Sequence, residues 1–152
     1  MIPHDMFDAK MTKEQKQLLT RRLAVAIKNQ PELMDLKGLL LGLGGSFLVA
    51  PPKNDPDIPL LLKSGFVMCG TVMLKVMAKS SCHQNISAVW KERKFGIVGI
   101  ATGYALSEDG LWRQHSWGIL RDGLLETTRE RTKYFGILLQ GPQAEQFVTH
   151  NL

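Results

Sequence analysis

The sequence predicts an α+β fold, in which N-terminal helices pack on an antiparallel β-meander. Two observations lead to this prediction. The first third of the chain has helical hydrophobic spacing behind a helix-capping signal, and the last third has β-branched and aromatic runs separated by turn residues. Since helices and strands follow one another as separate blocks, we expect them to be segregated in space. A chain of 152 residues is expected to form a single domain, residues 1–152.

The helical part is expected over residues 10–50. Residues 10–29 predict an amphipathic helix, because Thr12 and Gln15 have the spacing of a capping box and leucines follow at near-helical intervals. Residues 38–50 are apolar and rich in glycine, so they fit a buried strand or a close-packed helix equally well. Their glycines match neither the P-loop nor the dinucleotide-binding pattern, and we interpret them as packing residues.

The middle of the chain alternates loop signals with short elements. Residues 51–59 contain four prolines and predict a surface loop. Residues 66–77 are rich in Val and Met around a Gly-Thr break, which is typical of one or two short strands. Residues 80–94 predict a second helix, with Ser80 or Ser81 as its N-cap.

The predicted meander follows this helix. Its four strands are expected at residues 95–107, 111–120, 124–128 and 134–139. The Asp-Gly pair at 122–123 is a strong signal for a two-residue hairpin turn between the second and third of them.

Composition narrows the classes of partner. The net charge is +5, but the basic residues are scattered and form no basic helix interleaved with aromatics, so a nucleic-acid partner is not expected. The longest apolar run is too short to span a bilayer, and the first residues lack a secretory pattern. We therefore expect a cytoplasmic protein with no membrane contact and with reduced cysteines. The sequence does not indicate an oligomeric state.

Cys82 is the candidate nucleophile. It directly follows the expected Ser cap, so it lies in the first turn of a helix, where the exposed backbone N–H groups and the helix dipole favour a thiolate. The N–H of Cys82 is also a candidate donor to an oxyanion. Asn85 lies three residues on, along the same helix face, and is a candidate to steady the thiol or the helix start. Cys69 lies in an apolar run and is expected to be a small buried hydrophobe.

His83 is adjacent to Cys82, and adjacent helical residues point about 100° apart. It is therefore poorly aimed to act as the base for that thiol. A zinc site built from Cys69, Cys82, His83 and His115 would fit no closed metal-binding spacing. We expect neither a metal nor another cofactor.

His115 is the candidate base, with Trp117 on the same strand face behind it and Gln114 beside it as a supporting residue. Glu126 is the candidate acid that orients the ring. A strict two-residue turn would pair Glu126 with position 119, four residues from His115, so strand twist or a bulge would have to bring the two together. In that flat register Glu130 would lie opposite His115, and it is retained as an alternative.

These stretches resemble the papain-like cysteine peptidase and transglutaminase-like superfamily. The order is the same: a cysteine at a helix start, then a histidine and an acid on neighbouring strands. Residues 115–117 resemble the His-x-Trp of transglutaminase-like domains, and residues 125–128 stand where that pattern has Asp-Pro-Thr. The departures are Glu for Asp and Thr for Pro. A closer likeness is to small bacterial and phage proteins, and it extends over about residues 80–139.

The resemblance implies a papain-like core at about residues 66–140 and a catalytic triad of Cys82, His115 and Glu126. It does not supply a substrate. Thiol, imidazole and carboxylate together are the equipment of acyl transfer. We therefore expect a thiol-dependent hydrolase or acyltransferase that acts on an amide bond of a peptide or protein. The alternative is a non-catalytic binding or regulatory protein on the same fold, which an exposed 38–50 segment would favour.

Overall fold

The computed structural model describes residues 11–152. Its helices are α2 (Lys13–Asn29), α3 (Glu32–Leu43), α4 (Ile58–Ser64), α5 (Cys82–Glu92) and α6 (Pro142–Asn151). Its strands are β1 (Phe47–Leu48), β2 (Phe66–Met68), β3 (Thr71–Leu74), β4 (Ile97–Leu106), β5 (Leu111–Leu120), β6 (Gly123–Glu126) and β7 (Lys133–Leu139). The α+β class expected from the sequence is confirmed.

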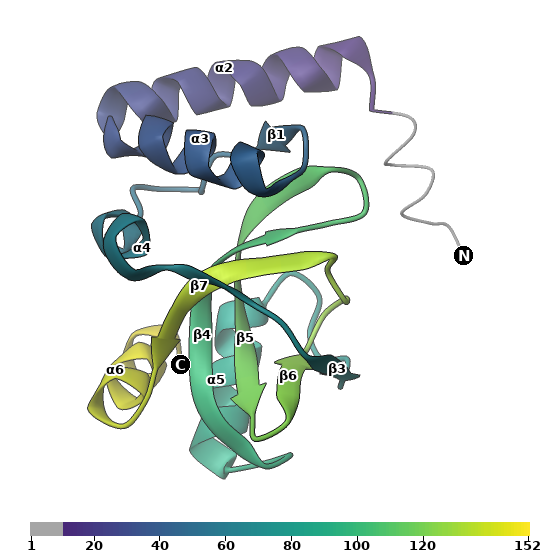
Figure 1. The fold of residues 1–152 in the computed structure, drawn as a ribbon, viewed down its shortest axis with the longest axis vertical. Helices are drawn as coiled ribbons and strands as arrows, with labels where there is room; N and C mark the ends of the chain where they lie inside the picture. Colours follow the sequence, from purple (N-terminus) through teal and green to yellow (C-terminus); the bar gives the residue numbers. More distant parts are fainter. Residues whose placement is uncertain (1–10) are drawn as a thin grey trace.

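Helices α2 and α3 form a layer across one end of the sheet (Figure 1). The predicted capping box is confirmed: the backbone N–H of Gln15 donates to the Thr12 hydroxyl at 3.0 Å, and that of Thr12 donates to the Gln15 side chain at 2.7 Å. The apolar run at 38–50, whose pattern fitted a helix or a strand, contains both. Helix α3 continues to Leu43 and is followed by β1. Leu40 is fully buried within this layer.

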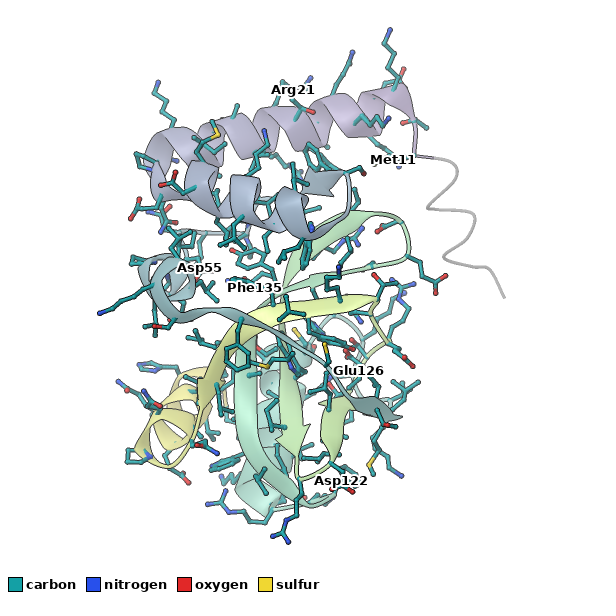
Figure 2. All side chains as sticks on the ribbon, viewed as in Figure 1. Met11, Arg21, Asp55, Asp122, Glu126 and Phe135 are labelled. Atoms are coloured by element: carbon teal, nitrogen blue, oxygen red, sulfur yellow. The ribbon has the colours of Figure 1, made fainter. Side chains whose placement is uncertain are left out.

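The segment at 51–59 differs from the predicted surface loop. Asp55 is buried there, and its carboxylate accepts a hydrogen bond from the Tyr104 hydroxyl on β4 at 2.9 Å. The Gln30 side chain binds the backbone of Asp55 twice, at 2.7 and 2.9 Å. Helix α4 then begins at Ile58, inside the predicted loop. Asp55 lies between the helical layer and the sheet, and its contacts join the two (Figure 2).

The sheet is mixed and curled, and its main path runs β2-β7-β4-β5-β6-β3. Strands β4, β5 and β6 form an antiparallel meander as expected, but the fourth predicted strand, β7, pairs antiparallel with β4 and does not lie beside β6. The prediction of a wholly antiparallel sheet is wrong, because β3 pairs parallel with β6 and β1 pairs parallel with β5. Both parallel strands come from the part of the chain before α5, so they reach the sheet through long connections. β3 is an edge strand of the sheet.

Helices α5 and α6 pack against the sheet (Figure 1). Their apolar residues share one buried cluster with Ile100 and Leu125 of the sheet. The predicted apolar stripe of α5 is confirmed, since Ile86, Val89 and Trp90 are all buried. Helix α6 was not predicted, because its sequence carries only a short apolar pattern. No helix within residues 11–152 is long and apolar enough to cross a membrane.

Candidate functional site

Cys82 is the first residue of α5 and is partly buried. Ser81 occupies the N-cap position as expected, but its side chain does not cap the helix. The Ser81 hydroxyl instead donates to the carbonyl of Lys79 at 3.3 Å. Backbone N–H groups in a first helical turn have no intrahelical partner. The amino end of α5 therefore presents donors beside the thiol that no serine hydroxyl occupies.

The β5–β6 hairpin has a different register from the predicted one. Leu120 pairs with Gly123, and Gly118 pairs with Leu125, so the turn residues are 121 and 122. Gly123 belongs to the strand because β3 approaches it closely: a Cβ at this position would lie 2.2 Å from the Thr71 carbonyl oxygen. Compared with the predicted pairing, Glu126 moves two positions closer to His115, and no bulge is needed to join them.

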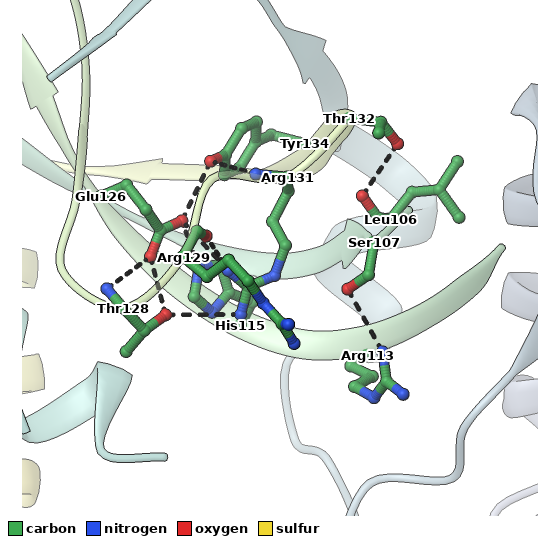
Figure 3. A network of polar contacts seen from close by, with 10 residues as sticks. All are labelled: Leu106, Ser107, Arg113, His115, Glu126, Thr128, Arg129, Arg131, Thr132 and Tyr134. Atoms are coloured by element: carbon green, nitrogen blue, oxygen red, sulfur yellow. Dashed lines mark hydrogen bonds and ion pairs between the residues drawn. The ribbon is translucent and has the colours of Figure 1, made fainter. Parts of the chain in front are cut away.

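The carboxylate of Glu126 is fully buried and holds His115 in place. Its Oε1 lies 2.8 Å from Nε2 of His115 and accepts a hydrogen bond from the Tyr134 hydroxyl at 2.9 Å. Its Oε2 accepts two bonds from Thr128, from the backbone N–H and from the hydroxyl, both at 2.9 Å (Figure 3). Arg131 adds a cation 3.7 Å from Oε1. The alternative acid, Glu130, is exposed.

These contacts set the ionisation of the pair. Burial raises the pKa of Glu126, but the hydrogen bond and charge of His115 outweigh burial, together with Arg131 and the backbone of Thr128, and bring the pKa to about 2. Burial lowers the pKa of His115, but hydrogen bonds with Cys82 and Glu126 outweigh it and the net pKa is raised. At neutral pH the acid is an anion that favours the protonated imidazole.

The thiol of Cys82 lies beside this imidazole. Burial raises its pKa, but hydrogen bonds with His115 and His83 overcome that effect and lower the pKa to about 5. Since Glu126 engages Nε2 of His115, Nδ1 is the ring nitrogen left for the sulfur. The fold thus brings Cys82, His115 and Glu126 together, although they come from a helix and two strands.

The supporting residues predicted from the sequence fare differently. Trp117 is fully buried and stacks on His115, with ring centroids 5.9 Å apart and planes at 21°. Asn85 does not bind the thiol: its amide donates to the carbonyl of Ala78 at 2.7 Å and fastens the segment before α5. Gln114 pairs with Tyr104 across the sheet, so its side chain leaves β5 on the face opposite that of His115.

His83 is a site residue that sequence reasoning set aside. Its Nδ1 lies 2.6 Å from the Ser116 hydroxyl, which in turn lies 2.8 Å from the Thr102 hydroxyl. The same imidazole contributes to lowering the pKa of Cys82. Adjacent helical side chains leave the backbone about 100° apart, but this does not prevent the ends of the Cys82 and His83 side chains from coming into contact. A hydroxyl at 116, next to the predicted base, was the available signal.

Cys69 is exposed, so the expectation that it is buried is wrong. It lies after β2, at a turn that carries Gly70 in the left-handed region. A mainly apolar hollow of about 380 Å³ includes Cys69 and the β5–β6 turn, but not His115 or Glu126. Among residues 11–152, no cluster of three His, Cys, Asp or Glu side chains could hold a metal ion.

Comparison with protein-family models, with curated proteins and with solved structures gave no match. The functional reading of this site therefore depends on its geometry and chemistry alone.

Proposed function

We propose that this chain is a thiol-dependent hydrolase or acyltransferase that acts on an amide bond through Cys82, His115 and Glu126. The observation that carries the proposal is the arrangement of a thiol at a helix amino end, beside an imidazole that a buried carboxylate binds at 2.8 Å. This arrangement lowers the pKa of the thiol to about 5. Such a thiol is a thiolate at neutral pH, and the thiolate is the nucleophilic form.

In the proposed reaction, the Cys82 sulfur attacks the amide carbonyl and forms a C–S bond. The carbonyl electron pair moves onto oxygen, and its return breaks the C–N bond. Protonated His115 gives its proton to the departing amine, which leaves a thioester. His115 then takes a proton from water or from an acceptor amine that attacks the thioester and releases the thiolate. Glu126 holds the imidazole and stabilises its charged form throughout.

The developing oxyanion needs hydrogen-bond donors. The backbone N–H of Cys82 is the first candidate, because it belongs to the first turn of α5 and Ser81 offers no side-chain cap there. The helix dipole adds partial positive charge at the same place. Electrostatic support for the transition state therefore comes from the element that carries the nucleophile.

A papain-like core is part of the proposal. It is supported by the packing of α5 against β4 and β5, with the thiol at the helix amino end and the imidazole and acid on adjacent strands. We propose a peptide or protein as the substrate, because both contain backbone amide bonds and side-chain amides. The proposal does not distinguish peptide cleavage, deamidation, isopeptide hydrolysis and transamidation.

The first test is the alkylation of the two cysteines by iodoacetamide as a function of pH, followed by peptide mapping. We expect Cys82 to reach half of its maximal rate near pH 5. At pH 6 it should react at least about fivefold faster than an ordinary thiol, since a greater thiolate fraction outweighs lower intrinsic nucleophilicity. His115→Ala should abolish the advantage. Cys69 is exposed and serves as the internal control.

Two results would contradict the proposal: a Cys82 profile centred near that of a free cysteine, or one that His115→Ala leaves unchanged. A second measurement addresses acyl transfer directly. Incubation with p-nitrophenyl acetate should release a burst of p-nitrophenol and acetylate Cys82 as a thioester that hydroxylamine removes. A binding protein on this fold would give no burst. The segment at 38–50, whose exposure would favour that alternative, packs in the core through Leu40 and Leu48.

A further inference from the structure

The site contains a second imidazole. Two consecutive residues at the start of α5, Cys82 and His83, contact two consecutive residues of β5, His115 and Ser116, whose side chains leave the strand on opposite faces. Cys82 interacts with His115, while His83 binds Ser116 at 2.6 Å. His83 also interacts with the Cys82 thiol. The sulfur therefore interacts with two imidazoles. Within residues 11–152, only that of His115 is hydrogen-bonded to a carboxylate.

The His83 ring is held in one orientation. Ser116 is fully buried and Thr102 is nearly so, and their hydroxyl oxygens lie 2.8 Å apart. The ring of Phe147 on α6 meets the His83 ring edge to face, with centroids 6.1 Å apart and planes at 71°. Strands β4 and β5 and helix α6 thus restrict a side chain that α5 projects.

The hydroxyl chain also selects the tautomer of the ring. Within residues 11–152, Ser116 is the one hydrogen-bond partner of the Thr102 hydroxyl. If the Thr102 hydroxyl did not donate to Ser116, its buried O–H would have no acceptor. Thr102 therefore donates to Ser116, and Ser116 donates to Nδ1 of His83. In the neutral ring the proton is consequently on Nε2. The Nε2–H is the donor that remains for the negative sulfur.

We propose that His83 is a positioning residue that holds the Cys82 sulfur as a thiolate by donating from Nε2, while His115 is the base. The two imidazoles divide the work: one exchanges the proton during acyl transfer and the other keeps its proton on Nε2. The role rests on the proposed thiol chemistry, but its measurement requires no turnover. Two further charged groups interact with Cys82 and His83: Asp57 before α4 acts on His83, and Arg131 before β7 acts on Cys82.

The test compares the pH profile of Cys82 alkylation in the whole protein with that of two variants. His83→Phe keeps a ring between α5 and α6 but removes the donor. We expect the midpoint of the profile to rise by about one pH unit, a tenfold change in the thiol ionisation constant, as for the loss of one hydrogen bond to a charged group. Ser116→Ala should raise the midpoint by a smaller amount, because the His83 ring loses the hydrogen bond that fixes its orientation.

Gln84→Ala is the matched control, since Gln84 is the next residue of α5 and is exposed. It should leave the midpoint unchanged. Thermal unfolding separates a structural role from the proposed one: a merely structural His83 would change the melting temperature and leave the midpoint where it is. If His83→Phe does not fold, Ser116→Ala decides.

The proposal is overturned if both folded variants keep the wild-type midpoint. It is also overturned if Ser116→Ala alone is folded and shows no shift. A wild-type midpoint near that of free cysteine removes the proposed function and this role together. A low wild-type midpoint that neither variant moves removes only the role of His83.

Discussion

The carboxylate of Glu126 receives hydrogen bonds from His115, Tyr134 and Thr128 while its side chain is fully buried. A buried anion is costly unless it is paired and bonded, and each of these partners reduces that cost. Both carboxylate oxygens are used, which fixes the plane of the group as well as its position. Glu126 therefore orients the imidazole rigidly, which is what the proposed triad requires of its third member.

A pH-dependent contribution to stability follows from this carboxylate. Its pKa falls from 4.5 to about 2 in the folded protein. A depressed carboxyl pKa stabilises the fold above the unfolded pKa, and the contribution is lost as the pH falls through the folded value. We predict that Glu126→Gln lowers the free energy of unfolding most at pH 6–7, with a difference from wild type that shrinks between about pH 4.5 and 2.

Urea unfolding at pH 7, 4 and 3 measures this difference. Glu130→Gln is the control, because Glu130 lies close in sequence but is exposed. It should change stability little at any of these pH values, since isolated surface charges contribute little. A Glu126→Gln deficit that stays constant from pH 7 to 3 would contradict the assigned ionisation.

At the level of single elements, the position of α5 depends on a close approach to β5. A Cβ at Gly118 would lie 2.9 Å from Cδ1 of Ile86 and 3.0 Å from Cβ of Leu125. The helix packs here because glycine leaves room for the isoleucine. The thiol lies one turn before Ile86, so the distance between helix and strand also sets the distance between sulfur and imidazole.

We predict that Gly118→Ala destabilises the protein by roughly 1–3 kcal/mol, the usual cost of overpacking a core. It should also slow Cys82 alkylation at pH 6, because α5 is displaced from the strand that carries His115. Gly42→Ala is the matched control, since nothing lies within 4 Å of a Cβ at this helical position. Urea unfolding and the alkylation rate provide the two readouts. An unchanged alkylation rate in a destabilised Gly118→Ala would separate packing from the site.

The site elements were predictable where local signals were strong. The limits of β5 and the position of Cys82 in the first turn of α5 followed from residue pattern alone, although the helix was expected over residues 80–94 and is Cys82–Glu92. The hairpin register could not be predicted from local pattern. It depends on the close approach of β3 to Gly123, which is a contact between segments far apart in sequence. The Ser81 cap failed for a related reason, since the hydroxyl binds the preceding loop. Sequence reasoning therefore named the three candidate residues and the acid that binds the imidazole, but not the strand register or the bonds from Thr128 and Tyr134 that fix the carboxylate.

At the scale of the whole molecule, the helical layer and the sheet are joined by Tyr104 and Asp55. The tyrosine hydroxyl on β4 donates to a carboxylate that lies between the two layers. No local pattern predicts such a pair, because Asp55 lies among prolines and reads as a surface residue. Burial and the carboxylates of Asp55 and Asp57 raise the pKa of Tyr104, so its hydroxyl remains a donor.

We predict that Tyr104→Phe costs about 1–3 kcal/mol of stability, because it leaves a buried carboxylate with one donor fewer. The reactivity of Cys82 at pH 6 should be retained, since its histidine partners lie on β5 and α5. Denaturant unfolding and the alkylation rate check the two halves. Asp122→Asn, at an exposed turn position, provides the control. A parallel loss of thiol reactivity would show that the helical layer helps to form the site.

The unoccupied Ser81 cap has a consequence for local motion. A side-chain cap at this position would add about 1 kcal/mol to the helix, and α5 forgoes it. The bond from Asn85 to Ala78 anchors the preceding loop instead. We therefore expect the first turn of α5 to be less stable than a turn with a side-chain cap, while Ile86 and Val89 are buried further along the helix. In the proposed reaction, the carbonyl oxygen of a substrate would meet backbone N–H groups that are not already bonded to the Ser81 hydroxyl.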